Sequence, residues 1–282
     1  MNWIEKNEIL DALLNKEETL TTDSMDQGFE AEVLKISSNK ESFVLKVWNK
    51  NSKPDICFQY HLLNELHECG LPVSKPIGWG IDPHGNKVLF TSFDGTRVFR
   101  LDDKKMIEIA NILSSIHRIN PEKLTSTSLP KYDFIDYFFY EARKYEDIYN
   151  ALIPLVQQAQ MKQDRLIHGD FHLNNLLEDQ GKYSVIDWTN GQLGDFRYDF
   201  AWSLLLLKIY VPEQFVEIFY SAYLMDNNIS YEELQVYEAL ALLRWMTLNR
   251  IAATPLVPDI KVRVKSFISS NPYLNELEFT GF

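Results

Sequence analysis

Cysteine is scarce in this sequence, which has only Cys57 and Cys69 among its 282 residues. Both lie in one segment with helical periodicity. Twelve positions of helix (69 − 57) correspond to a rise of about 18 Å, too far for a disulfide bond. We therefore expect two reduced, buried thiols, as is usual in a cytoplasmic protein.

Basic residues are also few relative to acidic ones. The chain has 28 Lys and Arg against 40 Asp and Glu, a formal net charge of −12. A surface that binds nucleic acid or an anionic membrane normally needs a clustered excess of positive charge. We therefore expect neither of these partners, whereas a cationic small molecule is compatible with the charge.

Long hydrophobic runs are missing. The apolar run 204–207 is far too short to span a bilayer, and charges follow Met1 where a signal peptide needs an apolar segment. The chain has no internal repeat or long linker. These features predict a cytoplasmic globular protein.

The periodicity of apolar residues changes along the chain from mixed to helical. The first part favours a helix at 3–14, a hairpin of strands 29–37 and 42–48, a helix at 54–69, and strands at 77–81 and 87–93. The later part favours helices at 102–118, 132–147, 148–162, 196–209, 213–226, 231–253 and 258–269, interrupted by a loop and a hairpin within 166–188. The pattern predicts an α+β protein with domains 1–94 and 95–282.

The densest group of polar residues lies in the interruption between helices. The run His168-Gly169-Asp170-Phe171-His172-Leu173-Asn174-Asn175 is followed by Ile186-Asp187-Trp188 at the end of the predicted hairpin. Phosphoryl transfer needs positioned metal ions and a group that orients the attacking hydroxyl. Asp170 can accept the hydroxyl proton, while Asn175 and Asp187 offer the oxygen ligands that Mg²⁺ prefers.

These motifs resemble the aminoglycoside phosphotransferase and choline kinase superfamily over nearly the whole chain. The family patterns are His-Gly-Asp-x-x-x-x-Asn, Ile-Asp-Trp, and Gly-Asp-x-x-x-Asp-hydrophobic-Ala, the last at 194–201. The resemblance implies a protein-kinase-like two-lobed fold, with a small antiparallel-sheet N-lobe and a mostly helical C-lobe, that uses ATP or GTP and Mg²⁺. It also implies roles for five residues: Asp170 as catalytic base, Asn175 and Asp187 as metal ligands, and His168 and Asp199 as supports of the catalytic loop.

The first part of the chain resembles the nucleotide-binding lobe of that family. Lys46, in Val44-Leu45-Lys46-Val47, matches the strand lysine that pairs with phosphates. The segment 89–95 matches the hinge, where the backbone at Thr91 and Phe93 would contact adenine. Gln59 stands where the family usually has a Glu beside the lysine, and it cannot neutralise that charge. The nucleotide-covering loop, 27–29, has a single glycine.

Three functional interpretations remain open. The first is a kinase of a small hydroxylated molecule, with aminoglycosides, choline or ethanolamine, amino acids, sugars and macrolides all possible acceptors. The second is a kinase-fold nucleotide-binding or scaffold protein with little activity, favoured by Gln59 and the single-glycine loop. A protein-directed kinase is disfavoured because no long activation segment separates Trp188 from Asp195. The sequence does not indicate the oligomeric state.

Several conspicuous residues also have structural interpretations. Asp195 could cap the helix that follows it. The aromatic residues of 132–140, with Trp202 and Trp245, favour core packing over a cage for a quaternary amine. His117 is expected to be buried and hydrogen-bonded. A zinc site at His168 and His172 is disfavoured because Gly169 argues against the helix that this spacing needs.

Overall fold

The computed structural model describes the chain except residues 16–19, 26–30, 40, 126, 254–255 and 282. It divides into two compact units, which are described separately. Unit 1 consists of Met1–Val98, Leu124–Ser128 and Leu173–Thr189, and unit 2 of Phe99–Lys123, Leu129–His172 and Asn190–Phe282. Two later segments therefore pack with the first 98 residues, whereas the sequence pattern places one boundary after residue 94.

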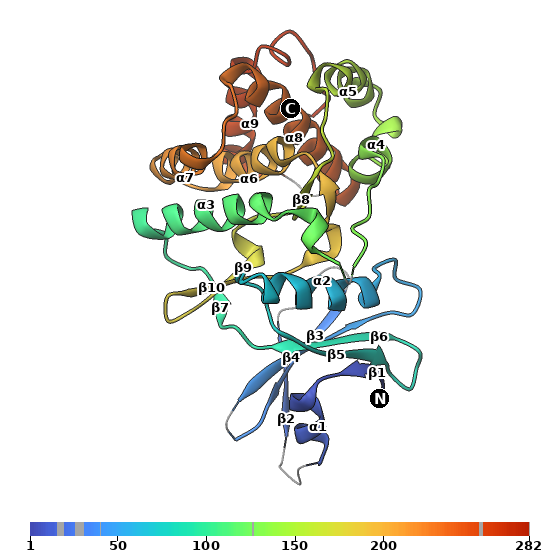
Figure 1. Cartoon of the computed structure of the whole chain (residues 1–282). Coiled ribbons are helices and arrows are strands. Elements are labelled where there is room, and N and C mark those ends of the chain that lie inside the picture. Colours follow the sequence, from blue (N-terminus) through green and yellow to red (C-terminus); the bar gives the residue numbers. More distant parts are fainter. Residues whose placement is uncertain (16–19, 26–30, 40, 126, 254–255, 282) are drawn as a thin grey trace. The chain divides into compact units, whose positions relative to one another are not determined.

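Unit 1 is built on a six-stranded antiparallel sheet (Figure 1). Its strands are β1 (Asn2–Lys6), β2 (Thr21–Ser24), β3 (Ala31–Ser37), β4 (Ser42–Trp48), β5 (Pro76–Ile81) and β6 (Lys87–Ser92). They follow the order β1-β5-β6-β4-β3-β2. The expected hairpin of residues 29–37 and 42–48 is the β3–β4 pair, and its first two residues lie outside the described residues.

The two faces of this sheet differ because side chains alternate along each strand. Phe43 and Leu45 of β4 belong to a core cluster with Leu10 of α1 (Glu8–Asn15). Lys46 follows Leu45 directly, so its side chain lies on the opposite face of the sheet from this core cluster. Figure 1 shows α1 and α2 on different sides of the sheet.

Helix α2 (Ile56–Glu68) contacts β5 and β6. It starts where the carboxylate of Asp55 accepts the backbone N–H of Phe58 at 3.0 Å, and it ends before Gly70, which adopts a positive φ of 79°. Leu62 and Leu66 are fully buried on one side of the helix. These signals agree with the expected helix at 54–69.

A second, three-stranded sheet of unit 1 contains the segment that follows the polar loop. It consists of β7 (Thr96–Arg97), β9 (Leu176–Asp179) and β10 (Lys182–Val185). Gln180 and Gly181, which connect β9 to β10, both have positive φ, as a tight hairpin turn with the twist of its strands requires. This hairpin is the one that the sequence predicts.

Unit 2 is mostly helical. Its helices are α3 (Asp103–Arg118), α4 (Phe134–Phe138), α5 (Glu146–Ala159), α6 (Phe196–Tyr210), α7 (Glu213–Asp226), α8 (Tyr231–Ala252) and α9 (Pro258–Ser270). A short two-stranded sheet joins β8 (Arg165–Ile167) to β11 (Gln192–Gly194). Helix α8 packs against both α5 and α6, and α3 packs against α7. Unit 2 also has single-turn 3₁₀ helices at Pro121–Lys123 and Ala142–Lys144. Of the two others described, Leu173–Asn175 belongs to unit 1, and Trp188–Asn190 lies where the chain passes from unit 1 to unit 2 after Thr189.

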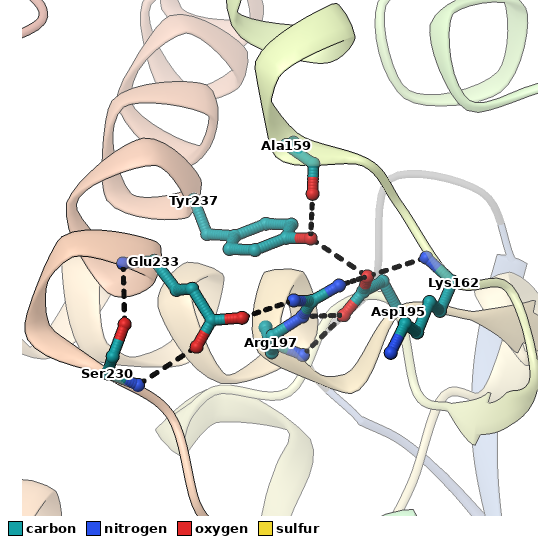
Figure 2. A network of polar contacts seen from close by, with 7 residues as sticks. All are labelled: Ala159, Lys162, Asp195, Arg197, Ser230, Glu233 and Tyr237. Carbon is teal, nitrogen blue, oxygen red and sulfur yellow. Dashed lines mark hydrogen bonds and ion pairs between the residues drawn. The ribbon is translucent and has the colours of Figure 1, made fainter.

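Asp195 anchors the start of α6 within a network of polar contacts (Figure 2). Its carboxylate accepts the backbone N–H of Arg197 at 3.0 Å and the Nη2 of the same residue at 2.7 Å. It also accepts the hydroxyl of Tyr237, from α8, at 2.9 Å, while Arg197 reaches Glu233 at 2.7 Å. The helix-cap interpretation of Asp195 is thereby confirmed, and the network fixes α6 to α8.

Three expectations were wrong in part. Residues 3–14 do not form one helix, because Asn2–Lys6 pair with β5 and the helix begins at Glu8. The expected helix 132–147 is limited to Phe134–Phe138, since the chain then turns through Ala142–Lys144. The thiols of Cys57 and Cys69 are free, but Cys69 is exposed and not buried because it lies at the helix end.

Within the described ranges, no helix has both the length and the hydropathy needed to cross a membrane.

Candidate functional site

The two predicted metal ligands lie at the same end of the β9–β10 hairpin in unit 1. Leu176 pairs with Val185, so Asn175 precedes one strand where Asp187 follows the other. The backbone N–H of Ile186 donates to the carbonyl of Asn175 at 3.0 Å, which extends the pairing by one step. Asn175 is buried and Asp187 is exposed. The hairpin register therefore places Asn175 and Asp187 at neighbouring backbone positions.

Asp187 has an unusual backbone conformation. Its φ of 65° lies in the left-handed region, which costs a residue with a Cβ about 1 kcal/mol or more. The hydroxyl of Thr189 donates to Oδ1 of Asp187 at 2.7 Å and accepts Nε2 of Gln59, from α2, at 3.4 Å. This chain of contacts orients the Asp187 carboxylate.

Lys46 and Gln59 are not joined in the structure. Across the described part of the chain, no hydrogen bond connects their side chains, and buried Gln59 contacts Thr189 instead. Lys46 is half-buried in the middle of β4. The contact that the structure gives to the Gln59 side chain is therefore with Thr189, next to Asp187 in the same unit.

Of the two predicted hinge residues, Thr91 lies near the end of β6 and Phe93 directly follows the strand. Thr91 is buried, and its hydroxyl donates to the carbonyl of Ser92 at 3.2 Å. The backbone N–H of Phe93 donates to the carbonyl of Ser42 at 3.2 Å, and the ammonium of Lys35 lies 4.1 Å from the centre of its ring. The single-glycine loop 27–29 lies outside the described residues.

In unit 2, Asp199 holds the loop that carries Asp170. Its two carboxylate oxygens accept the backbone N–H groups of His168 and Gly169, each at 2.9 Å. Nε2 of His117 lies 3.0 Å from Oδ2, and Nδ1 of His117 lies 2.6 Å from the hydroxyl of Tyr223. Asp199 is fully buried. Burial raises its pKa, but the hydrogen bond and charge of His117 and the contacts from His168 outweigh this, so the net pKa is lowered.

Asp170 lies among donors and positive charge. Its Oδ1 accepts the indole N–H of Trp202 at 2.9 Å, and Nε2 of His172 lies 3.5 Å from Oδ2. The guanidinium of Arg244 lies 3.9 Å from Oδ1. Desolvation raises the pKa of Asp170, but His172, Arg244 and His168 together hold it well below its usual range. The carboxylate is therefore ionised at neutral pH.

Arg244 is a buried cation that fixes the same loop from α8. Its Nη1 donates to the carbonyl of Gly169 at 2.8 Å. Its guanidinium lies 4.0 Å from the ring centre of Trp202 and 4.5 Å from that of Phe138. Gly169 has a φ of 76°, and an added Cβ would lie 2.8 Å from the carbonyl oxygen of Asn190, so this position requires glycine.

Sequence reasoning does not identify the site contacts of three residues. Trp202 is buried in the core, as expected, and its indole N–H also donates to Asp170. Arg244 lies outside the sequence motifs, although a single charge within the apolar run 239–246 is a usual sign of a buried, partnered arginine. Thr189 carried no signal beyond its position two residues after Asp187. The prediction of a buried, hydrogen-bonded His117 is confirmed.

The sequence matches a known family over most of its length. The sequence model of the APH phosphotransferase enzyme family matches residues 24–243. This chain therefore belongs to that family of phosphotransferases. Among the curated proteins, none matches this chain in sequence.

Solved structures share the fold at low sequence identity. Amicoumacin kinase hAmiN, in complex with AMP-PNP, Ca²⁺ and Ami, has a TM-score of 0.67 and 17% identity over 92% of this chain and 90% of that chain. Spectinomycin phosphotransferase APH(9)-Ia, in complex with ADP and spectinomycin, has a TM-score of 0.64 and 17% identity over 94% and 93%. Choline kinase from Cryptosporidium parvum Iowa II has a TM-score of 0.62 and 14% identity over 90% of each chain. The expected kinase-like fold is confirmed.

Proposed function

We propose that this protein is an ATP-dependent kinase that phosphorylates a hydroxyl group of a small molecule. The observation that carries the proposal is the environment of Asp170. An ionised carboxylate, held by Trp202 and Arg244, lies on a loop whose backbone is bound by buried Asp199. Such a fixed carboxylate suits a group that must orient one hydroxyl with little freedom.

Asp170 acts as the catalytic base. It accepts the proton of the acceptor hydroxyl while the hydroxyl oxygen bonds to the γ-phosphorus of ATP. The bond from that phosphorus to the bridging oxygen breaks, and the oxygen leaves with ADP. Since its pKa is low, Asp170 is a weak base. It therefore first orients the hydroxyl. It takes the proton late, after the bond to phosphorus has made the hydroxyl proton more acidic.

Asn175 and Asp187 would hold Mg²⁺. The two residues lie at one end of the hairpin, and their donor set, an amide and a carboxylate, fits a hard cation. When bound, the ion neutralises charge on the phosphates. Lys46 would bind phosphate oxygens, and the backbone at Thr91 and Phe93 would contact the base. The complex of the amicoumacin kinase with AMP-PNP and Ca²⁺ supports this use of nucleotide and metal, with GTP as the alternative donor.

The division into a nucleotide-binding part, 1–94, and a catalytic and acceptor part, 95–282, belongs to the same proposal, with 173–189 packing on the first part. The acceptor class is a hydroxylated small molecule. The structural neighbours act on amicoumacin, spectinomycin or choline according to their names, and the net charge of −12 favours a cationic acceptor.

A screen tests the proposal directly. The full chain is titrated with Mg-ATP and Mg-GTP in a thermal-shift assay, and ADP or GDP release is then measured over a panel of aminoglycosides, amino-alcohols, amino acids and sugars. Metal-dependent stabilisation together with release stimulated by one acceptor supports the kinase. Stabilisation without stimulation by any acceptor favours the nucleotide-binding or scaffold alternative, and the absence of any stabilisation contradicts nucleotide binding.

A further inference from the structure

We propose that unit 1 contains a second cation site, for a transition metal of the zinc class, formed by Glu5, Cys57 and His61. The three residues contribute a carboxylate, a thiol and an imidazole from two separate elements, β1 and α2. One ligand atom from each lies within 4.8 Å of the other two. None of these residues belongs to the proposed phosphoryl-transfer machinery.

The helix presents two of the ligands on one face. Cys57 and His61 are four residues apart, so successive turns of α2 place them side by side. Both are half-buried, as is Glu5, so an ion and one solvent ligand can reach them. Three protein ligands with an open fourth position are a common zinc arrangement.

The distance between Glu5 and His61 is close to that of a bound site. Nε2 of His61 lies 3.1 Å from Oε1 of Glu5. In a tetrahedral zinc site with ordinary bond lengths, neighbouring ligand atoms lie about 3.3–3.7 Å apart. Glu5 and His61, which form an ion pair here, are thus already at nearly the right separation. The sulfur of Cys57 lies within 4.8 Å of both ligand atoms, so a shift of about 1 Å or less completes the set.

The carboxylate ligand is already oriented by another side chain. Glu5 lies opposite Trp79 in the pairing of β1 with β5, and the indole N–H of Trp79 donates to Oε1 of Glu5 at 3.0 Å. Metal-binding carboxylates are typically held by such outer contacts. The hydrogen bond from Trp79 therefore fixes the orientation of the Glu5 carboxylate before any metal binds.

The donor set also indicates which cation fits. Sulfur and nitrogen ligands favour Zn²⁺ or Co²⁺, whereas Mg²⁺ and Ca²⁺ prefer oxygen throughout. On binding, the Cys57 thiol loses its proton to solvent and a sulfur–metal bond forms, with no change in oxidation state.

Cobalt titration of the full-length, reduced and chelator-treated protein tests the site, because a thiolate–Co²⁺ bond gives a charge-transfer absorption band. We expect one Co²⁺ per chain with this band, displaced by Zn²⁺ and not by excess Mg²⁺. Cys57→Ala and His61→Ala should lose the band. Cys69→Ala, which removes the exposed cysteine at the end of the same helix, should keep it.

Two further variants keep the test decisive. Cys57→Ser retains a polar group of similar size, so loss of the band in a variant with unchanged melting temperature shows loss of the ligand and not of the fold. Trp79→Phe should weaken Co²⁺ binding about tenfold or more. Absence of the band in the wild-type protein, equal loss in Cys69→Ala, or displacement by Mg²⁺ would overturn the proposal.

Discussion

The indole N–H of Trp202 donates to Oδ1 of Asp170 over 2.9 Å. The two residues are 32 positions apart, and Trp202 lies on α6, three residues after Asp199, whose carboxylate binds the loop that carries Asp170. One helix therefore holds both the backbone and the side chain of the proposed catalytic residue. This arrangement makes Trp202 a positioning residue for the carboxylate.

Replacing Trp202 by Phe tests this contact. The variant keeps an aromatic ring over Arg244 and removes the donor to Asp170. A hydrogen bond to a charged group contributes about 1.5–3 kcal/mol, so we expect kcat to fall about tenfold or more with little change in the KM for nucleotide. Trp245→Phe is the matched control, because the indole of Trp245 donates to Tyr210. An equal fall in both variants would show a loss of packing instead.

Thr189→Val should weaken binding of the metal–nucleotide complex. The change removes the hydroxyl that donates to Asp187 at 2.7 Å while it nearly preserves the volume. We expect a smaller thermal shift with Mg-ATP and a higher Mg²⁺ requirement, and Thr189→Ser should restore both. If Thr189→Val binds Mg-ATP like the wild-type protein, the hydroxyl does not position Asp187.

Asp199→Asn should destabilise unit 2. The buried carboxylate accepts two backbone N–H groups and contacts His117, and an amide offers only one acceptor oxygen. Because a buried group loses its partner, we expect a decrease of about 2 kcal/mol or more in the free energy of unfolding, measured with urea. Asp226→Asn, which loses an exposed ion pair with Arg118, should cost less than about 1 kcal/mol. Similar losses would contradict the buttressing role.

Acid should weaken the attachment of the C-terminal segment to α5. Hydrogen bonds from Arg250 are the main cause that lowers the pKa of Asp147 to about 2, opposed by burial and assisted by the N–H of Thr280. A lowered pKa in the folded state stabilises the fold above the unfolded value near 4, and the stabilisation is lost as the pH falls toward 2. Asp147→Asn should therefore cost about 2 kcal/mol at pH 7, about half of that near pH 3 and little near pH 2, by urea unfolding. A cost that does not depend on pH would contradict this assignment.

Local pattern was sufficient to predict most of the elements. The β9–β10 hairpin follows from two short apolar runs around Gln180 and Gly181, and α7 from a regular helical period between clear ends. The expected helix at 132–147 was too long because its aromatic residues continue the apolar pattern through a turn. Residues 2–6 pair with β5, more than 70 positions further along the chain. The periodicity of a short segment does not indicate such a distant partner.

The candidate site divides in the same way. The order of Asp170, Asn175 and Asp187 along the chain is readable because the loop and the hairpin are local. The contacts from Trp202 and Arg244 join residues 32 and 75 positions apart, so they depend on how α6 and α8 pack. The contact of Gln59 with Thr189 likewise joins residues 130 positions apart, so it depends on how the β9–β10 hairpin packs against α2.

The most direct test of the central claim is to compare Asp170→Asn with Asp187→Ala, using the acceptor that gives the highest ADP release. The account predicts that Asp170→Asn binds Mg-ATP like the wild-type protein while its turnover falls by orders of magnitude, whereas Asp187→Ala also loses Mg-ATP binding. Equal loss of nucleotide binding in both variants, or turnover that persists in Asp170→Asn, would contradict the assignment of Asp170 as the catalytic base.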